Sequence, residues 1–189
     1  GQGTPLFVTQ IIQATHDVTT FRFQADPLCR FNYRPGQFCS LILSIEGKKV
    51  VRSYSISSTP TRPYSLDITI KRVPGGLVSN WLPDNLKLGD RIEASGPRGK
   101  FCLTPGKIPS KLLFLSAGSG VTPLMSMVRW LYDVSAAQVD IVFFNFVRSP
   151  QDIVFGPELE LLAASHDSLR IVTCCGSAGV TPDWKGPSG

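Results

Sequence analysis

The sequence predicts an antiparallel β-barrel followed by an incomplete α/β domain with a doubly wound parallel sheet. Three observations support this order: short strands separated by turn signals in the first half, a continuous apolar strand that begins at residue 111, and alternating strands and helices after it. We therefore divide the chain into a barrel at residues 1–104, a linker at 105–110 that contains Pro and Gly, and the first part of an α/β domain at 111–189.

The barrel is predicted from short runs that are enriched in β-branched and aromatic residues. Turn-forming residues separate these runs, and residues 65–72 alternate apolar and polar side chains as a half-buried strand does. The expected strands are residues 6–12, 18–24, 37–44, the run around Arg52, 65–72 and 90–95. Residues 76–82 are the helix expected in this half, and we expect Pro83 to end it.

The second half begins with residues 111–116, whose unbroken apolar character is typical of a strand buried in a parallel sheet. Residues 124–132 have helical apolar spacing, and Pro123 stands at the helix start, where its missing N–H is not needed. We interpret the apolar side chains of this helix, Met125, Met127 and Trp130 among them, as core residues. Strands at 139–146 and 169–174, with a helix at 157–164 between them, complete a β-α-β-α-β order.

Composition excludes several classes of function. The net charge of +5 is too small to indicate nucleic-acid binding, and no apolar run approaches the ~20 residues of a membrane-spanning helix. The five cysteines are irregularly spaced and the two histidines stand alone, so we predict no metal site and no disulfide framework. This cysteine usage favours the cytoplasm.

The motif Arg52-Ser53-Tyr54-Ser55 carries the first candidate site. On a strand, alternate side chains share a face, so Arg52 and Tyr54 project to one side. A guanidinium grips phosphate and a phenol lies against a ring, so this face suits an anionic linker joined to a flat aromatic group. The alternative is an ordinary strand with an exposed Arg and a packed Tyr.

Two glycine-rich turns carry the other candidate sites. Gly75-Gly76 precedes the expected helix 76–82, and a helix N-terminus attracts anions, although a plain turn would look the same. Gly118 and Gly120 lie between an expected strand and an expected helix, where glycines let the backbone approach a pyrophosphate. Pro123 replaces the third glycine of the usual dinucleotide fingerprint, which tells against an ordinary dehydrogenase.

Together with the turn Gly96-Pro97-Arg98-Gly99-Lys100-Phe101, these motifs resemble those of the ferredoxin–NAD(P) reductase superfamily. The resemblance implies an FAD-binding barrel in which Arg52 pairs with the pyrophosphate, Tyr54 flanks the isoalloxazine and Ser55 lies near flavin N5. Phe101 is expected to pack into the barrel. Ser55 and Thr122 are the expected catalytic residues. The expected cofactor-binding residues are Arg52, Ser53, Tyr54, Ser55, Thr69, Ile70, Lys71, Gly76, Val78, Ser79, Gly118, Ser119, Gly120, Thr122, Pro123 and Arg148.

The choice between NADH and NADPH depends, by the same resemblance, on a basic residue after the third α/β strand that would grip a 2′-phosphate. Residues 173–178 supply no basic side chain, so NADH is favoured. Arg148, after the second strand, could instead reach the adenosine half of the nucleotide.

These expectations combine into an FAD-dependent NADH oxidoreductase that passes hydride to the flavin and then single electrons to an iron–sulfur or haem partner. The motifs look most similar to bacterial NADH reductases that serve the hybrid-cluster protein, with reductase components of ring-hydroxylating oxygenases close behind. Alternatives are a non-catalytic flavin-binding electron-transfer module and a free-flavin reductase. Relatives continue beyond the point that corresponds to Gly189, so we expect a truncated fragment whose truncation can abolish its activity. Its partner is expected to be a separate protein or a later domain.

Overall fold

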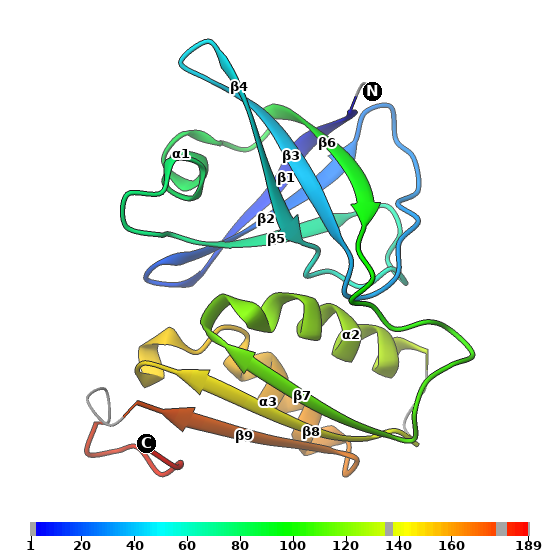
Figure 1. Ribbon diagram of the computed structural model, residues 1–189, viewed down its shortest axis with the longest axis vertical. Coiled ribbons are helices and arrows are strands. Elements are labelled where there is room, and N and C mark those ends of the chain that lie inside the picture. Colours follow the sequence, from blue (N-terminus) through cyan, green and yellow to red (C-terminus); the bar gives the residue numbers. More distant parts are fainter. Residues whose placement is uncertain (1–2, 135–137, 177–180, 189) are drawn as a thin grey trace.

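The computed structural model describes residues 3–134, 138–176 and 181–188. The first half forms a six-stranded antiparallel sheet in the order β4-β3-β6-β1-β2-β5 (Figure 1). Beyond the end of β4, an antiparallel bridge pairs Ile56 with Ile68 of β5 and brings the two edges of the sheet together. The strands are β1 (Thr4–Thr15), β2 (Val18–Ala25), β3 (Phe38–Ile45), β4 (Lys48–Ser55), β5 (Leu66–Lys71) and β6 (Arg91–Arg98).

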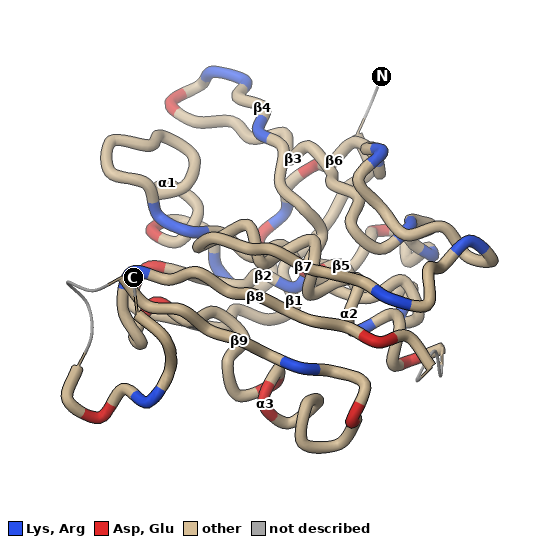
Figure 2. The backbone as a smooth tube through the Cα atoms, turned by 60° about the horizontal axis from the view of Figure 1, so that its bottom comes forward, with Lys and Arg blue, Asp and Glu red and all other residues tan. Residues whose placement is uncertain are grey.

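The second half is a parallel sheet in the order β7-β8-β9 with helices between its strands. Figure 2, turned from the first view, shows these three strands running side by side. The antiparallel barrel followed by an α/β unit is thus confirmed. The elements are β7 (Lys111–Ala117), η1 (Gly118–Gly120), α2 (Val121–Asp133), β8 (Asp140–Val147), η2 (Pro150–Asp152), α3 (Gly156–Ser165) and β9 (Leu169–Cys175).

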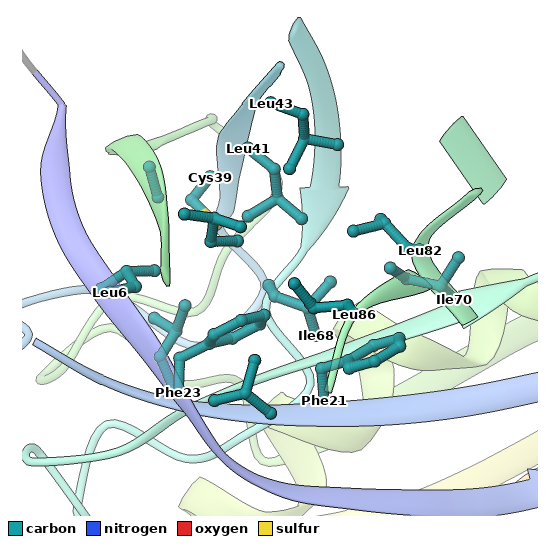
Figure 3. Close-up of a cluster of buried hydrophobic side chains, with 14 of the residues drawn as sticks. Leu6, Phe21, Phe23, Cys39, Leu41, Leu43, Ile68, Ile70, Leu82 and Leu86 are labelled. Atoms are coloured by element: carbon teal, nitrogen blue, oxygen red, sulfur yellow. The ribbon is translucent and has the colours of Figure 1, made fainter. Parts of the chain in front are cut away.

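Each half has its own apolar core. In the barrel, alternate residues of β3, among them Leu41 and Leu43, point inward onto Phe21, Phe23 and Ile68 and their neighbours (Figure 3). In the α/β half, Phe114 and Phe143 pack edge to face with ring centroids 5.9 Å apart. Met125 and Met127 of α2 are buried, which agrees with their interpretation as core residues.

Helix α1 (Leu77–Asn85) covers one opening of the barrel and buries Val78 and Leu82 in its core. The expectation that Pro83 ends this helix is wrong, because the helix continues to Asn85. A proline this close to the C-terminal end removes only one intrahelical hydrogen bond, and burial of Leu82 offsets that loss.

Helix α2 lies between the barrel and the parallel sheet (Figure 1). Gly36 of the barrel makes this approach possible, because a Cβ there would collide with Met127 and lie 2.5 Å from Phe101 O. The expectation that Phe101 packs into the barrel is wrong: its side chain is 64% exposed. Strand β6 ends at Arg98, so the chain has already left the sheet when it reaches Phe101. Within the described residues, no helix has both the length and the apolar character to cross a bilayer.

Candidate cofactor-binding clefts

A cleft of about 770 Å³ lies where β4, β5, the start of α1 and the start of α2 meet. All but three of the sequence-predicted cofactor-binding residues line it, and these three are Ile70, Gly118 and Arg148. The expected catalytic residues Ser55 and Thr122 both line it, one from the barrel and one from α2. The lining residues are Arg52, Ser53, Tyr54, Ser55, Thr69, Lys71, Val73, Gly75, Gly76, Leu77, Val78, Ser79, Ser119, Gly120, Thr122 and Pro123.

Strand β4 presents Arg52 and Tyr54 on one face, as the alternation of a strand requires. Their cross-strand partners are Leu41 and Cys39, whose side chains belong to the barrel core. Arg52 itself is exposed, and its Nη1 donates to the Val51 carbonyl at 2.8 Å, an exposed contact that a phosphate oxygen can replace. Partial burial raises the pKa of Tyr54, and this effect outweighs the nearby positive charge of Arg52, which lowers the pKa. The Tyr54 phenol therefore remains a hydrogen-bond donor at neutral pH.

Successive residues of β5 point to opposite faces of the strand. The Thr69 hydroxyl is 2.8 Å from the hydroxyls of both Thr20 and Ser57, so it is committed to a buried network. Ile70 points the other way, into the barrel core, and its side chain does not line the cleft. Lys71 lies at the end of the strand, with its Nζ 3.5 Å from the Asp17 carboxylate.

The N-terminus of α1 meets the cleft without a side-chain cap or an acidic residue in its first turn. Gly76 is the N-cap, and a Cβ there would collide with Ser79 Oγ and lie 3.0 Å from the Val73 carbonyl. No Asp or Glu of the described chain lines this cleft. The cleft thus offers a guanidinium, a helix N-terminus and an ammonium whose carboxylate partner, Asp17, lies outside the cleft. This donor set fits the linking phosphates of FAD.

The start of α2 supplies the opposite wall. Gly118 has φ +53, a backbone conformation that favours glycine, and the Thr122 hydroxyl donates to the Ser119 carbonyl at 3.1 Å. A Cβ built on Gly118 or Gly120 would meet no described atom within 4 Å. Because packing does not require glycine at Gly120, the open space beside it fits a ligand that approaches the backbone closely.

A second cleft of about 470 Å³ lies at the carboxyl ends of β7, β8 and β9, where ligands of open α/β sheets bind. Gly118, Arg148 and Cys174 line it, and Lys71 lines both clefts, so the two adjoin. The part of the NADH prediction that rests on Ser177 and Ala178 lies outside the described residues.

Arg148 is held by carboxylates that the sequence reasoning missed. Its Nη2 lies 3.1 Å from Asp152 and 3.5 Å from Asp17 of the barrel. Burial acts to raise the pKa of Asp152, but hydrogen bonds from Arg148 and Ser149 outweigh it and lower the pKa. His16, Asp17 and Asp152 come within metal-ligating reach of one another, but Arg148 and Lys71 already neutralise these carboxylates. In the sequence, the four-residue spacing between Arg148 and Asp152 could have indicated that these two side chains pair.

Comparison with known proteins identifies the family of each half of the chain. Residues 5–102 match the oxidoreductase FAD-binding domain family, and residues 114–189 match the oxidoreductase NAD-binding domain family. The glycine betaine monooxygenase reductase subunit of Pseudomonas aeruginosa (strain UCBPP-PA14) is 49% identical over 95% of this chain and 49% of its own length. Ferredoxin–NADP reductase B of Sorangium cellulosum is 37% identical over 84% of this chain and 63% of its own length.

Among solved structures, the flavohaem-like FAD/NAD-binding domain of nitric oxide dioxygenase from Vibrio cholerae superposes with a TM-score of 0.89 at 23% identity, over all of this chain and 79% of that one. This likeness shows the fold. The chain spans about half the length of the first curated relatives that it matches. By its sequence and its fold, the chain belongs to the oxidoreductase FAD-binding domain family, with an oxidoreductase NAD-binding domain following in the same polypeptide.

Proposed function

We propose that this chain is the FAD-binding unit and the first part of the nicotinamide-binding unit of an NADH-dependent flavoprotein reductase. Residues 1–104 would hold FAD, 105–110 would link the units, and 111–189 would begin the nicotinamide unit. The observation that carries this proposal is the pair of adjoining clefts, one with phosphate-binding groups from the barrel and one at the carboxyl ends of a parallel sheet.

Within the first cleft, each group has a task that its chemistry suits. Arg52 and the α1 N-terminus at Gly76 would bind the pyrophosphate. Tyr54 would lie against the ring system, and its phenol O–H would donate a hydrogen bond to a hydroxyl. Ser55 and Thr122 line opposite walls, so they would orient the two reacting rings from the two sides. Bound FAD would supply an acceptor that takes up two electrons and releases them singly.

No proton-transfer residue is required of the protein for hydride transfer, so its contribution is placement of the two rings and exclusion of water. Lys71 and the backbone of Ser119 and Gly120 border the space through which the nicotinamide half would extend from the second cleft toward the first. Gly118 and Gly120 leave that space free of side chains.

We favour NADH over NADPH. Cys174 and Cys175 end β9 without a basic side chain, and the charge of Arg148 is shared with Asp17 and Asp152. Two relatives carry NADPH or NADP in their names, so the opposite preference is the alternative to test. The ratio of kcat/KM for NADH to that for NADPH tests it, and a ratio below one would reverse the assignment.

The electron acceptor is proposed to be an iron–sulfur or haem protein or domain. Relatives of this chain are named as reductase components of monooxygenases, which favours an oxygenase partner over the hybrid-cluster protein that the motifs first suggested. Reduction of a candidate oxygenase by NADH, followed through its own iron absorbance in the presence and absence of this protein, would decide between them.

Removal of Arg52 tests the flavin site. We expect Arg52→Ala to weaken FAD binding by about 1.5–3 kcal/mol, or roughly tenfold to a hundredfold, because a charge-assisted phosphate contact is lost. FAD titration followed by flavin fluorescence measures the dissociation constant. Arg34→Ala is the matched control, since Arg34 is exposed on the barrel and lies outside both clefts. An unchanged dissociation constant in Arg52→Ala would remove the assignment. FAD that binds but is not bleached by NADH in a polypeptide of the relatives' full length would indicate a non-catalytic flavin module.

A further inference from the structure

Helix α2 is hydrogen-bonded to the barrel segment that directly follows the Arg52 strand. We call residues 57–61 the post-β4 segment. Ser126 Oγ donates to the Ser58 carbonyl at 2.6 Å, and Arg129 Nη1 donates to the Ser57 carbonyl at 2.6 Å. Asp133 accepts a hydrogen bond from Thr61. Positions 126, 129 and 133 share one helix face because their spacing is three and four residues.

The barrel end of this contact is rigidly held. The Ser57 N–H donates to the Asp67 carbonyl at 2.9 Å, and the Ser57 hydroxyl is 2.8 Å from that of Thr69 on β5. The Ser58 hydroxyl accepts from the Asp67 N–H at 2.9 Å and lies 2.9 Å from the Tyr33 phenol oxygen. Ser57 and Ser58 are both buried. A shift of their carbonyls would therefore disturb the barrel itself.

The α/β end is equally held. Arg129 Nε and Nη2 donate to the two carboxylate oxygens of Glu158 on α3 at 2.8 and 2.6 Å. The guanidinium carbon lies 4.9 Å from the centroid of the Phe155 ring. All three guanidinium nitrogens are thus engaged, two inside the α/β half and one across to the barrel. A planar fork of this kind fixes direction as well as distance.

This contact is linked to the proposed reaction site through β4 on the barrel side and through α2 on the other side. Ser57 is two residues after Ser55, and Arg129 is seven residues, about two helical turns, after Thr122. Because Ser55 of the barrel and Thr122 of α2 both line the first cleft, a movement of α2 along the post-β4 segment would change the separation of the barrel and α2 walls.

We propose that Arg129, assisted by Ser126, is a positioning residue that sets the separation between the flavin-binding and nicotinamide-binding walls of the cleft. The expected effect on the NADH rate rests on the proposed function, whereas the expected effect on the position of the two halves rests on geometry alone. Arg129 touches neither proposed cofactor site, since it lines neither cleft.

The test compares Arg129→Met with two controls in the FAD-loaded protein. Arg170→Met removes an exposed arginine whose ion pair, with Asp140 at 3.6 Å, lies within the α/β half. Glu158→Gln weakens the pair inside the α/β half but leaves the Arg129 contact to Ser57 available. We measure FAD content, reduction by dithionite, the rate of flavin bleaching at saturating NADH, and the radius of gyration by small-angle X-ray scattering with and without FAD.

For Arg129→Met we expect full FAD content and full reduction by dithionite, a larger radius of gyration, and NADH-driven bleaching slowed about tenfold to a hundredfold, the effect of a misplacement near 1 Å. Ser126→Ala should change both readouts in the same direction by less, and Arg170→Met should leave them unchanged. A wild-type NADH rate in Arg129→Met would overturn the proposal. Glu158→Gln loosens the α/β end of the fork, so it should slow bleaching by less than Arg129→Met does. Equal losses in Arg170→Met and Arg129→Met would also overturn the proposal, because loss of any arginine of the α/β half would then have the same effect. If NADH does not bleach the wild-type flavin even in a polypeptide of the relatives' full length, the proposed function fails, while the scattering comparison still tests the contact.

Discussion

The two walls of the cleft are held by different kinds of structure. The barrel wall is fixed by side chains: Thr20, Ser57 and Thr69 share buried hydrogen bonds, and the paired side chains of Arg22 and Asp67 lie beside them with contacts of 2.8 Å. The α/β wall is backbone: a 3-10 turn of Gly118–Gly120 runs into α2, and its glycines have no described side-chain neighbours.

This difference indicates which wall should be intact before a ligand arrives. Buried networks with every member satisfied hold one geometry, whereas a glycine turn bordered by open space is completed by whatever binds there. We therefore expect substitutions in the barrel wall to change stability and FAD retention, and substitutions in the α/β wall to change the use of NADH with little effect on folding.

The largest effect is expected at the glycines, where the two walls can be compared directly. Gly76→Ala places a Cβ against Ser79 and the Val73 carbonyl, so we expect it to displace the α1 N-terminus, with a loss of stability of about 1–3 kcal/mol and weaker FAD binding. Gly120→Ala meets no described neighbour, so FAD binding and melting temperature should be unchanged while KM for NADH rises. Thermal unfolding, FAD titration and steady-state kinetics on both variants provide the comparison. Equal loss of FAD in the two variants would contradict the division between the walls.

The buried hydroxyl network is the second test. Thr69→Val preserves the shape of the side chain but leaves the hydroxyls of Thr20 and Ser57 without their shared partner. We expect the free energy of unfolding to fall by about 1–3 kcal/mol, measured by urea denaturation of the FAD-free protein. Thr4→Val is the control, because Thr4 is exposed on β1 and lies outside this network. A Thr69→Val protein as stable as the wild type would mean that the network does not hold the barrel wall.

Local patterns in the sequence predicted most of the fold and the members of the first cleft. The alternation of β4 placed Arg52 and Tyr54 together, and the strand–glycine–helix order placed Thr122 at a helix start. The same alternation separates Ile70 from Thr69 and Lys71, so the core position of Ile70 was available from the pattern. Pro83 and Phe101 were mispredicted because burial of Leu82 and the end of β6 depend on packing.

Contacts between the halves could not be predicted. The Ser-Ser-Thr-Pro run after the Arg52 strand is a local turn signal, and nothing near it in the sequence indicates that its carbonyls bind Ser126 and Arg129 about seventy residues later. The same is true of Asp17, whose partner Arg148 lies in the other half of the chain. Hydrogen bonds of this range depend on how two folded units meet, which residue periodicity does not encode.

A smaller effect is expected at Arg148, because it is an exposed side chain shared between two carboxylates. We expect Arg148→Ala to raise KM for NADH by only about twofold to fivefold, the range of an exposed charge contact, with kcat and FAD binding unchanged. Steady-state kinetics with NADH measures this directly. A change of a hundredfold or more would show that Arg148 grips the nucleotide itself, and the proposed sharing of its charge would then be wrong.

The smallest effect is expected in acid. Because hydrogen bonds from Arg148 and Ser149 lower the pKa of Asp152 in the folded protein, the unfolded chain binds more protons between the folded and unfolded pKa values. The stabilisation is therefore present in full above the unfolded pKa, near 3.8, and is lost as the pH falls through the folded value. Below about pH 4, the unfolding free energy of Asp152→Asn should fall less than that of the wild type, with a difference below ~1 kcal/mol. Ser149→Ala should differ from the wild type in the same direction by less still. Urea denaturation at a series of pH values measures this slope. A steeper decline in Asp152→Asn would show that the carboxylate is destabilised by burial, so that the contact between Arg148 and Asp152 joins the two halves without stabilising them.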